Sequence, residues 1–360
     1  MIFNSIIPLP FYTPLFYIAM LFVILLVFLK LQIRGYTIYS NKKEYASFVL
    51  LVAVTLYMGL RPISFMFGDM GIYNKYFIEF ANGGEIENNK DYLWRLFMKI
   101  CSGFMSAKTF FLLCAVLYIV PLYSACKKWF GNNMYIPFLM FVASFSFWAY
   151  GTNGIRNGVA TSFAVYALAY NNNKYFKYFI LVIAYFFHAS IIIPISAYVL
   201  TLFYSNSKHY LMGWFFAIFL SLALGGFWEN LFVSFGFGGG RLTHLTGERF
   251  KDIITTGFRW DFLIYSTSAI FTGYYFIFKK KFKDPIYIQL FNIYVTTNAF
   301  WVLIIRSGFS NRIAYLSWFL MAAVIFYPFF KQQFFKKQQR VLAFTILVYY
   351  GFTYFMFLIL

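Results

Sequence analysis

The sequence predicts an all-α fold, that of an integral membrane protein that crosses the bilayer many times. Hydrophobic residues make up 62% of the 360 residues and charged residues 11%, whereas soluble domains have about 45–50% and 25%. Apolar runs of membrane-spanning length recur along the whole chain. At about 20 residues per span, the chain has room for about 11–12 transmembrane helices. We therefore expect residues 1–360 to form a single transmembrane domain.

Apolar runs place the individual spans. They lie near 9–29, 45–60, 108–126, 134–150, 155–170, 211–228, 259–278, 286–305, 312–330 and 341–360. A longer apolar run covers 175–204. We predict a hairpin of two short helices there, turning near His188 and Ala189. Only a double crossing brings the last basic connectors to the same side of the membrane as the first ones.

The basic connectors determine the predicted topology. Lys and Arg gather in connectors 30–44, 127–133, 171–177, 279–285 and 331–340, and such segments remain in the cytoplasm. Together with Lys208, which follows the predicted hairpin, the cytoplasmic side then holds 17 basic and two acidic residues, and both termini lie outside. Eight of the ten arginines fall on the outer side. Topology needs only positive charge, which Lys also supplies, so the outer arginines indicate recognition of phosphate or carboxylate.

Two predicted outer loops are long. Loop 61–107 contains two segments with apolar residues at helical spacing, 72–80 and 92–104. We interpret these as helices that lie in the membrane interface. Loop 229–258 is rich in glycine. Such a loop can expose backbone N–H groups to an anion, and it is more often a mobile lid. The arginines in and beside this second loop are candidates for substrate contact: Arg241, Arg249 and Arg259.

The composition argues against several classes of function. The net charge of +19 does not indicate nucleic-acid binding, because the chain has no length left for a soluble basic domain. The three cysteines lack metal-ligand spacing, and we interpret them as small apolar residues of membrane helices. The three histidines are scattered and have no carboxylate or cysteine partners at metal-binding spacing. No metal site and no cofactor are predicted.

Two outer clusters in the first half of the chain carry candidate residues. Arg61 ends the second predicted span, and Asp69 follows shortly after it. Snorkelling and helix capping would also explain these two residues. Arg156 begins a helix after a turn of small residues. A cation is unfavourable at the positive end of a helix, and a bound anion would offset that cost.

Two further candidates lie at predicted turns. His188 falls at membrane depth, where ionisable groups are rare and often functional, and it could act as a general base. Arg306 and Arg312 bracket a tight outer turn of small residues. Two arginines in this arrangement could hold a diphosphate from both sides. Together these clusters predict an outer basic site for a lipid whose head group carries phosphate.

At these clusters the chain resembles the EpsG-like family of Wzy-type polymerases of bacterial surface polysaccharides. The matching segments occur in the family's order: LRPISFMFGDMGIY at 60–73, GIRNGVATSFAVYAL at 154–168, YFFHASIIIPISAYVL at 185–200, FRWDFLIYS at 258–266 and SNRIAYLSWF at 310–319. They cover about a fifth of the chain. Asn157 stands where family members often have Gln, which leaves the substrate open.

The resemblance implies a GT-C-like glycosyltransferase on the outer face of the bacterial cytoplasmic membrane. Its substrates would be glycans on undecaprenyl diphosphate, polymerised into O-antigen, capsule or exopolysaccharide. Arg61, Arg156, Arg306 and Arg312 would contact the diphosphate, because preorganised cations stabilise a charged leaving group. Asp69 or His188 would deprotonate or position the attacking hydroxyl. A chain-length regulator is a candidate partner, and no metal is required.

Three alternatives remain at this stage. A polysaccharide ligase would share the outer arginine chemistry. A flippase for lipid-linked oligosaccharides should carry cations along a central cavity, whereas this chain has them near helix ends. A membrane O-acyltransferase would need a catalytic histidine that is reached from the cytoplasm. The sequence does not specify the sugars or the linkage.

Overall fold

The computed structural model describes residues 7–33, 45–86, 92–170, 172–234, 257–307 and 310–359. These residues form helices and no strand, so the predicted all-α fold is confirmed. Five helical stretches within them have the length and apolar composition to cross a membrane: Leu9–Gln32, Ala107–Asn133, Ser207–Leu224, Arg312–Lys331 and Gln338–Ile359. The chain is a polytopic membrane protein. The expected total of about 11–12 transmembrane helices stays a prediction.

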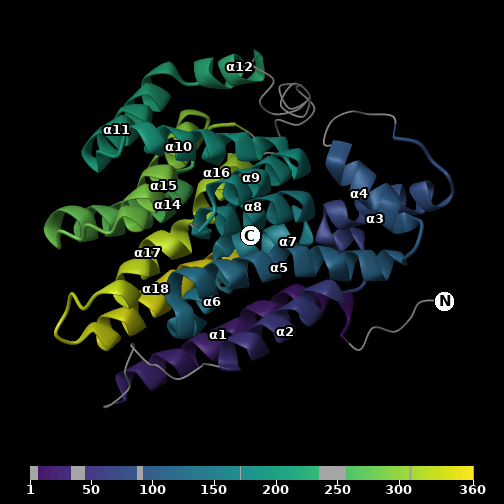
Figure 1. Ribbon diagram of the computed structural model, residues 1–360, viewed down its shortest axis with the longest axis horizontal. Coiled ribbons are helices and arrows are strands. Elements are labelled where there is room, and N and C mark those ends of the chain that lie inside the picture. Colours follow the sequence, from purple (N-terminus) through teal and green to yellow (C-terminus); the bar gives the residue numbers. More distant parts are fainter. Residues whose placement is uncertain are drawn as a thin grey trace. The chain divides into compact units, whose positions relative to one another are not determined.

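The helices, labelled in Figure 1, belong to two compact units. Unit 1 comprises Met1–Ile191 and Phe329–Leu360, and unit 2 comprises Ile192–Pro328. The α-helices of unit 1 are α1 (Tyr12–Gln32), α2 (Tyr45–Gly59), α3 (Asp69–Ala81), α4 (Tyr92–Ser102), α5 (Ala107–Phe130), α6 (Tyr135–Val142), α7 (Phe145–Thr152), α8 (Ile155–Ala169), α9 (Lys174–Phe187) and α18 (Gln338–Ile359). Those of unit 2 are α10 (Ile192–Phe203), α11 (Ser207–Leu224), α12 (Phe227–Ser234), α14 (Trp260–Tyr274), α15 (Pro285–Leu303) and α16 (Ser310–Trp318), and α17 (Met321–Lys331) runs from unit 2 into unit 1. A single domain over the whole chain stays a prediction.

Short helical turns complete both units. Unit 1 contains the 3-10 turns η1 (Leu9–Phe11), η2 (Phe65–Phe67), η3 (Gly131–Asn133) and η4 (Ala189–Ile191), and unit 2 contains the π-helical turn η6 (Tyr275–Lys279). The turn η2 lies in the connector between α2 and α3, and η4 follows α9. The turn η2 ends two residues before Asp69, and η4 begins directly after His188.

In unit 1, α5 lies between α2 and α8, and α9 packs against α8. The first and last long helices, α1 and α18, lie side by side (Figure 1). The Tyr350 hydroxyl of α18 donates a 2.6 Å hydrogen bond to the carbonyl of Tyr17 on α1. The Tyr118 hydroxyl of α5 donates to the carbonyl of Phe147 on α7. Buried tyrosines thus satisfy their hydroxyl groups while they join helices that are distant in sequence.

In unit 2, α15 is the central helix and contacts α10, α11, α14 and α16. Its Asn298 is fully buried and carries two hydrogen bonds. The amide oxygen accepts from the indole of Trp214 at 2.8 Å, and the amide nitrogen donates to Ser317 at 3.0 Å. A buried amide is costly unless it is paired, so this network specifies how α11, α15 and α16 pack.

Most predicted elements appear, and some contain additional breaks. The helix break expected near His188 is confirmed, because α9 ends at Phe187 and His188 adopts extended backbone angles. A reversal of the chain there stays a prediction. The expected span 134–150 is instead two short helices, α6 and α7. Ser144 separates them, and its hydroxyl bonds back to the carbonyl of Phe141 at 2.8 Å, which competes with regular helix formation.

The two segments predicted as interfacial helices are α3 and α4. Their apolar faces are buried, and Tyr73 of α3 contacts Trp94 of α4 with ring centroids 5.3 Å apart. Arg95, on the polar side of α4, places its guanidinium 5.1 Å from the ring centroid of Tyr76. The helical character is therefore confirmed, and the position of both helices in the interface stays a prediction.

Candidate functional site

The structure brings together two clusters that lie far apart in the sequence. The side-chain oxygen of Asn153, in the turn between α7 and α8, accepts a 3.0 Å hydrogen bond from the backbone N–H of Asp69, the first residue of α3. Gly68 fits against the same amide, because an added Cβ would lie 2.2 Å from the Asn153 oxygen. Its φ of +61° also favours glycine. The α2–α3 connector and the α7–α8 turn therefore form one junction.

Arg61 lies buried at this junction, with 3% of its surface exposed. One guanidinium nitrogen donates to the carbonyl of Met58. The other donates to the carbonyls of Gly151 at 3.0 Å and Thr152 at 3.4 Å. These carbonyls belong to the C-terminal ends of α2 and α7, where a cation is favoured by the helix dipole. Arg61 therefore ties two helix ends together.

The surroundings of Arg61 keep it in place. Its guanidinium carbon lies 5.4 Å from the ring centroid of Phe67. Burial lowers the pKa of Arg61, which lies in the connector after α2, to about 10, so the side chain remains charged at neutral pH. Its Nε atom is buried without a hydrogen-bond partner among the described residues. These contacts give Arg61 a structural role, and its predicted contact with a diphosphate stays a prediction.

Arg156 lies in the first turn of α8, three residues after Asn153. No acidic residue occupies that turn. The first N–H groups of a helix carry positive partial charge, so Arg156 adds a second positive element at the same place. Such a helix start can accept an anion. The junction thus brings the elements that carry Arg61, Asp69 and Arg156 into one part of unit 1.

His188 directly follows α9 and is half-buried. The preceding Phe187 packs against Trp94 and Phe97 of α4, with ring centroids 6.2 and 5.8 Å apart, and against Phe163 of α8. Because Trp94 also contacts Tyr73 of α3, an aromatic cluster connects the end of α9 to the helix that begins at Asp69. Both candidate bases therefore belong to unit 1.

A second group of candidate residues belongs to unit 2. Arg306 follows the C-terminal end of α15, and its guanidinium carbon lies 5.6 Å from the ring centroid of Phe258. The buried Nε of Arg306 has no hydrogen-bond partner within the described part of the chain. Arg312 lies in the first turn of α16. Joint contact of Arg156 and Arg306 with one diphosphate stays a prediction.

Arg259 makes a local ion pair. Its Nε and Nη2 atoms donate to the two carboxylate oxygens of Asp261 at 2.9 and 2.5 Å. Its guanidinium also lies over the ring of Phe262, 3.6 Å from the centroid. The guanidinium donors of Arg259 are therefore already engaged within the chain. The other two loop candidates, Arg241 and Arg249, lie outside the described residues.

Sequence reasoning does not identify Asn153, although it lies in the turn of small residues before Arg156. The usable signal was the short turn from Gly151 to Gly154, which lets two backbones approach closely. Its partner Asp69 lies 84 residues away, and no local pattern indicates that pairing. The described residues contain no group of three His, Cys, Asp or Glu side chains that could hold a metal ion.

Comparison with protein families gives a match over most of the chain. A family model described as the EpsG family matches residues 47–360, which include most of α2, all of α3 to α18, and every candidate residue. No curated protein and no solved structure matches the chain.

Proposed function

The chain belongs to the EpsG family, and from this premise we propose that it polymerises polysaccharide repeat units carried on undecaprenyl diphosphate. Membership implies a polysaccharide polymerase-like role in a membrane. The donor in our proposal is a growing glycan on the lipid carrier, and the acceptor is one repeat unit on the same carrier. O-antigen, capsule and exopolysaccharide are candidate products.

The proposed reaction is a glycosyl transfer. A hydroxyl of the acceptor's terminal sugar attacks the anomeric carbon of the donor sugar, and a new C–O bond forms. The bond between that carbon and the carrier diphosphate breaks, and the diphosphate leaves with the bonding electrons. The hydroxyl proton passes to a protein base. Positive groups around the diphosphate stabilise its developing charge, and we assign this role to Arg156, Arg306 and Arg312.

The junction around Arg61 is the observation that supports this proposal most strongly. A buried guanidinium with three carbonyl partners fixes the ends of α2 and α7. The adjoining hydrogen bond from the Asp69 backbone to Asn153 then holds the start of α3 next to the turn that precedes Arg156. An acid and a cation carried on backbone segments that are held together suit acid–base catalysis with a charged leaving group.

We therefore assign Asp69 as the base and Arg61 as a positioning residue. His188 becomes a second substrate contact, because it lies at the end of α9 beside the aromatic cluster. We further propose that the reaction occurs on the outer face of the cytoplasmic membrane. The outer arginines and the lysine-rich predicted cytoplasmic connectors support this orientation.

A complementation series tests the function. The gene is deleted in its host, and surface glycan is compared by gel after restoration of wild type, Arg156→Lys, Arg306→Lys or His188→Ala. A glycan ladder that collapses to one repeat unit on deletion, and is not restored by Arg156→Lys at normal protein level, supports a polymerase. Full-length glycan stranded on its lipid carrier would instead identify a ligase. An unchanged ladder would favour transport or acyl modification.

A further inference from the structure

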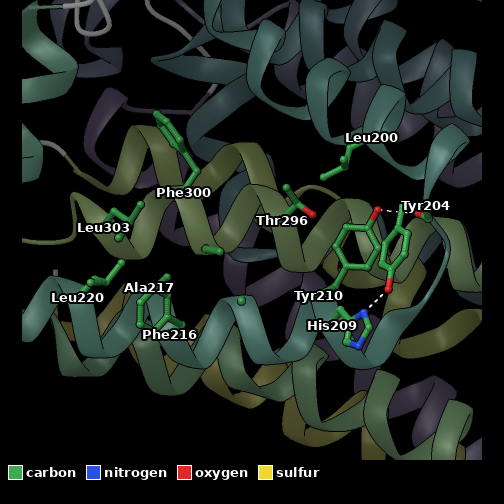
Figure 2. Close-up of a pocket in the computed structure, with 12 residues that line it drawn as sticks. Leu200, Tyr204, His209, Tyr210, Phe216, Ala217, Leu220, Thr296, Phe300 and Leu303 are labelled. Atoms are coloured by element: carbon green, nitrogen blue, oxygen red, sulfur yellow. Dashed lines mark hydrogen bonds between the residues drawn. The ribbon is translucent and has the colours of Figure 1, made fainter.

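An apolar groove runs along α11 in unit 2. Its volume is about 500 Å³, and it lies between α11, α15 and the end of α10 (Figure 2). The lining side chains along its length include Phe216, Ala217 and Leu220 from α11 and Thr296, Phe300 and Leu303 from α15. The stretch of α11 has the length and composition of a membrane span. The groove therefore lies along a helix that is expected to contact lipid.

The polar groups at one end of the groove are paired with one another. The Tyr204 hydroxyl and the His209 ring nitrogen Nδ1 share a hydrogen bond, and the two rings stack. The Tyr210 hydroxyl donates to the carbonyl of Tyr204 at 2.7 Å. Figure 2 shows these three side chains at one end, with Leu220 and Leu303 at the opposite end. Between the ends, the lining is almost wholly aliphatic and aromatic.

A cation follows in the chain shortly after the opposite end of the groove. Leu303 is the last residue of α15, and Arg306 follows three residues later. The buried Nε of Arg306 has no hydrogen-bond partner among the described residues. An apolar groove whose last lining residue is followed three residues later by an arginine is complementary to a hydrocarbon chain with an anionic head group.

The shape of the groove suits a branched chain. Gly213, Ala217 and Ala299 carry the smallest side chains of the lining and leave notches along it. A Cβ added to Gly213 would meet no atom within 4 Å, so the space beside it is open. From Tyr210 to Leu220 the groove follows α11 for about 15 Å. A chain with regular methyl branches would fill such notches better than a straight acyl chain.

We propose that this groove holds the polyprenyl chain of the lipid-linked substrate and delivers its diphosphate to Arg306. The assignment rests on the proposed function, because that function supplies a polyprenyl diphosphate as the substrate. The groove would hold the part of the chain nearest the diphosphate, and the remainder would extend into the bilayer. Binding the hydrocarbon on a rigid helix pair would fix the position of the head group.

Photo-crosslinking of the full-length protein in nanodiscs tests this assignment. The probe is undecaprenyl diphosphate with a diazirine on an isoprene unit near the diphosphate, and labelled peptides are identified by mass spectrometry. We expect labels on α11 and α15 in the wild type. Gly213→Leu should fill the groove and lower the label about tenfold. The matched control is Gly351→Leu on α18, because a Cβ at Gly351 also meets no atom within 4 Å.

Several outcomes would overturn the proposal. Labels outside α11 and α15 in the wild type would do so even if Gly213→Leu did not fold. Equal labelling of the two glycine variants, or equal competition by phosphatidylglycerol, would also reject it. If the label occupies the groove while deletion of the gene leaves the ladder unchanged, only the proposed polymerase function fails. If deletion collapses the ladder while the label lies elsewhere, only the groove assignment fails.

Discussion

The amide oxygen of Asn153 accepts a hydrogen bond from the backbone N–H of Asp69 at 3.0 Å, and this contact joins α3 to the turn before α8. The N–H belongs to the first turn of α3, where helix donors have no partner within the helix. Asn153 thus acts as a cap supplied from another part of the chain. The same contact holds the proposed base close to the turn that leads to Arg156.

Replacement of Asn153 should weaken both folding and activity. Asn153→Ala removes the acceptor, and loss of a helix cap costs about 1 kcal/mol. Asn153→Asp keeps an acceptor oxygen and should retain more of both properties. Thermal unfolding in detergent and the length of the glycan ladder measure the two effects. Equal losses in the Ala and Asp variants would show that the hydrogen bond is not what matters at this position.

Gly68→Ala should be more damaging than the same change at Gly131. The two glycines have nearly the same φ, +61° and +56°, so both alanines incur a backbone strain of about 1–3 kcal/mol. Only at Gly68 would the new Cβ also meet a neighbour, the Asn153 oxygen at 2.2 Å. The difference in unfolding temperature between the two variants therefore measures the close approach at the junction. A Gly131→Ala variant that is equally unstable would contradict this account.

The Arg61→Lys variant should be less stable than the wild type, because lysine does not reproduce the contacts of arginine at this position. The guanidinium donates hydrogen bonds to three carbonyls on two helix ends. The ammonium group of lysine is a single donor centre on a flexible side chain, so it cannot reproduce the planar arrangement of these donors. Loss of hydrogen bonds from a buried charged group costs about 1.5–3 kcal/mol each. We expect a lower unfolding temperature and less protein in the membrane. Normal stability with loss of polymer alone would instead support direct contact with the diphosphate.

Secondary structure was more predictable from the sequence than the contacts that form the site. Apolar periodicity predicted helices at α3 and α4, and the charge pattern predicted the break at His188. The break at Ser144 was not predicted, because its hydroxyl competes locally with the helix in an otherwise uniform apolar run.

The tertiary arrangement of the candidate residues was less predictable from the sequence than the secondary structure. Positive charge and the helix-start position identified Arg61 and Arg156, but two of the three carbonyl partners of Arg61 lie 90 and 91 residues away in the chain. The groove beside Gly213 likewise depends on how α11 packs against α15, which periodicity on either helix does not specify. Local patterns can identify a residue that needs a partner without identifying that partner.

Asp69→Asn should lower the rate of polymerisation more than His188→Gln. Asn has nearly the same shape as Asp but cannot take a proton from the acceptor hydroxyl, and loss of a general base costs about 10²–10⁴-fold in rate. Gln retains a hydrogen-bond donor and acceptor at His188, so it should preserve substrate contact. The measurement is chain elongation in vesicles at matched protein amounts. The reverse order of the two variants would assign the base to His188.

Arg306 and Arg259 offer a matched pair for the proposed diphosphate contact. Arg259 already gives two donors to Asp261, whereas Arg306 has a buried Nε with no hydrogen-bond partner in the described ranges. Arg306→Lys removes a fork of donors from a developing charge, which costs about 10²–10³-fold in rate. Arg259→Lys should change elongation little, because an exposed ion pair contributes at most about 1 kcal/mol. Equal elongation rates in the two variants would show that Arg306 does not contact the diphosphate. Thermal unfolding of both proteins is the control, since a stability loss confined to Arg306→Lys would mimic a catalytic defect.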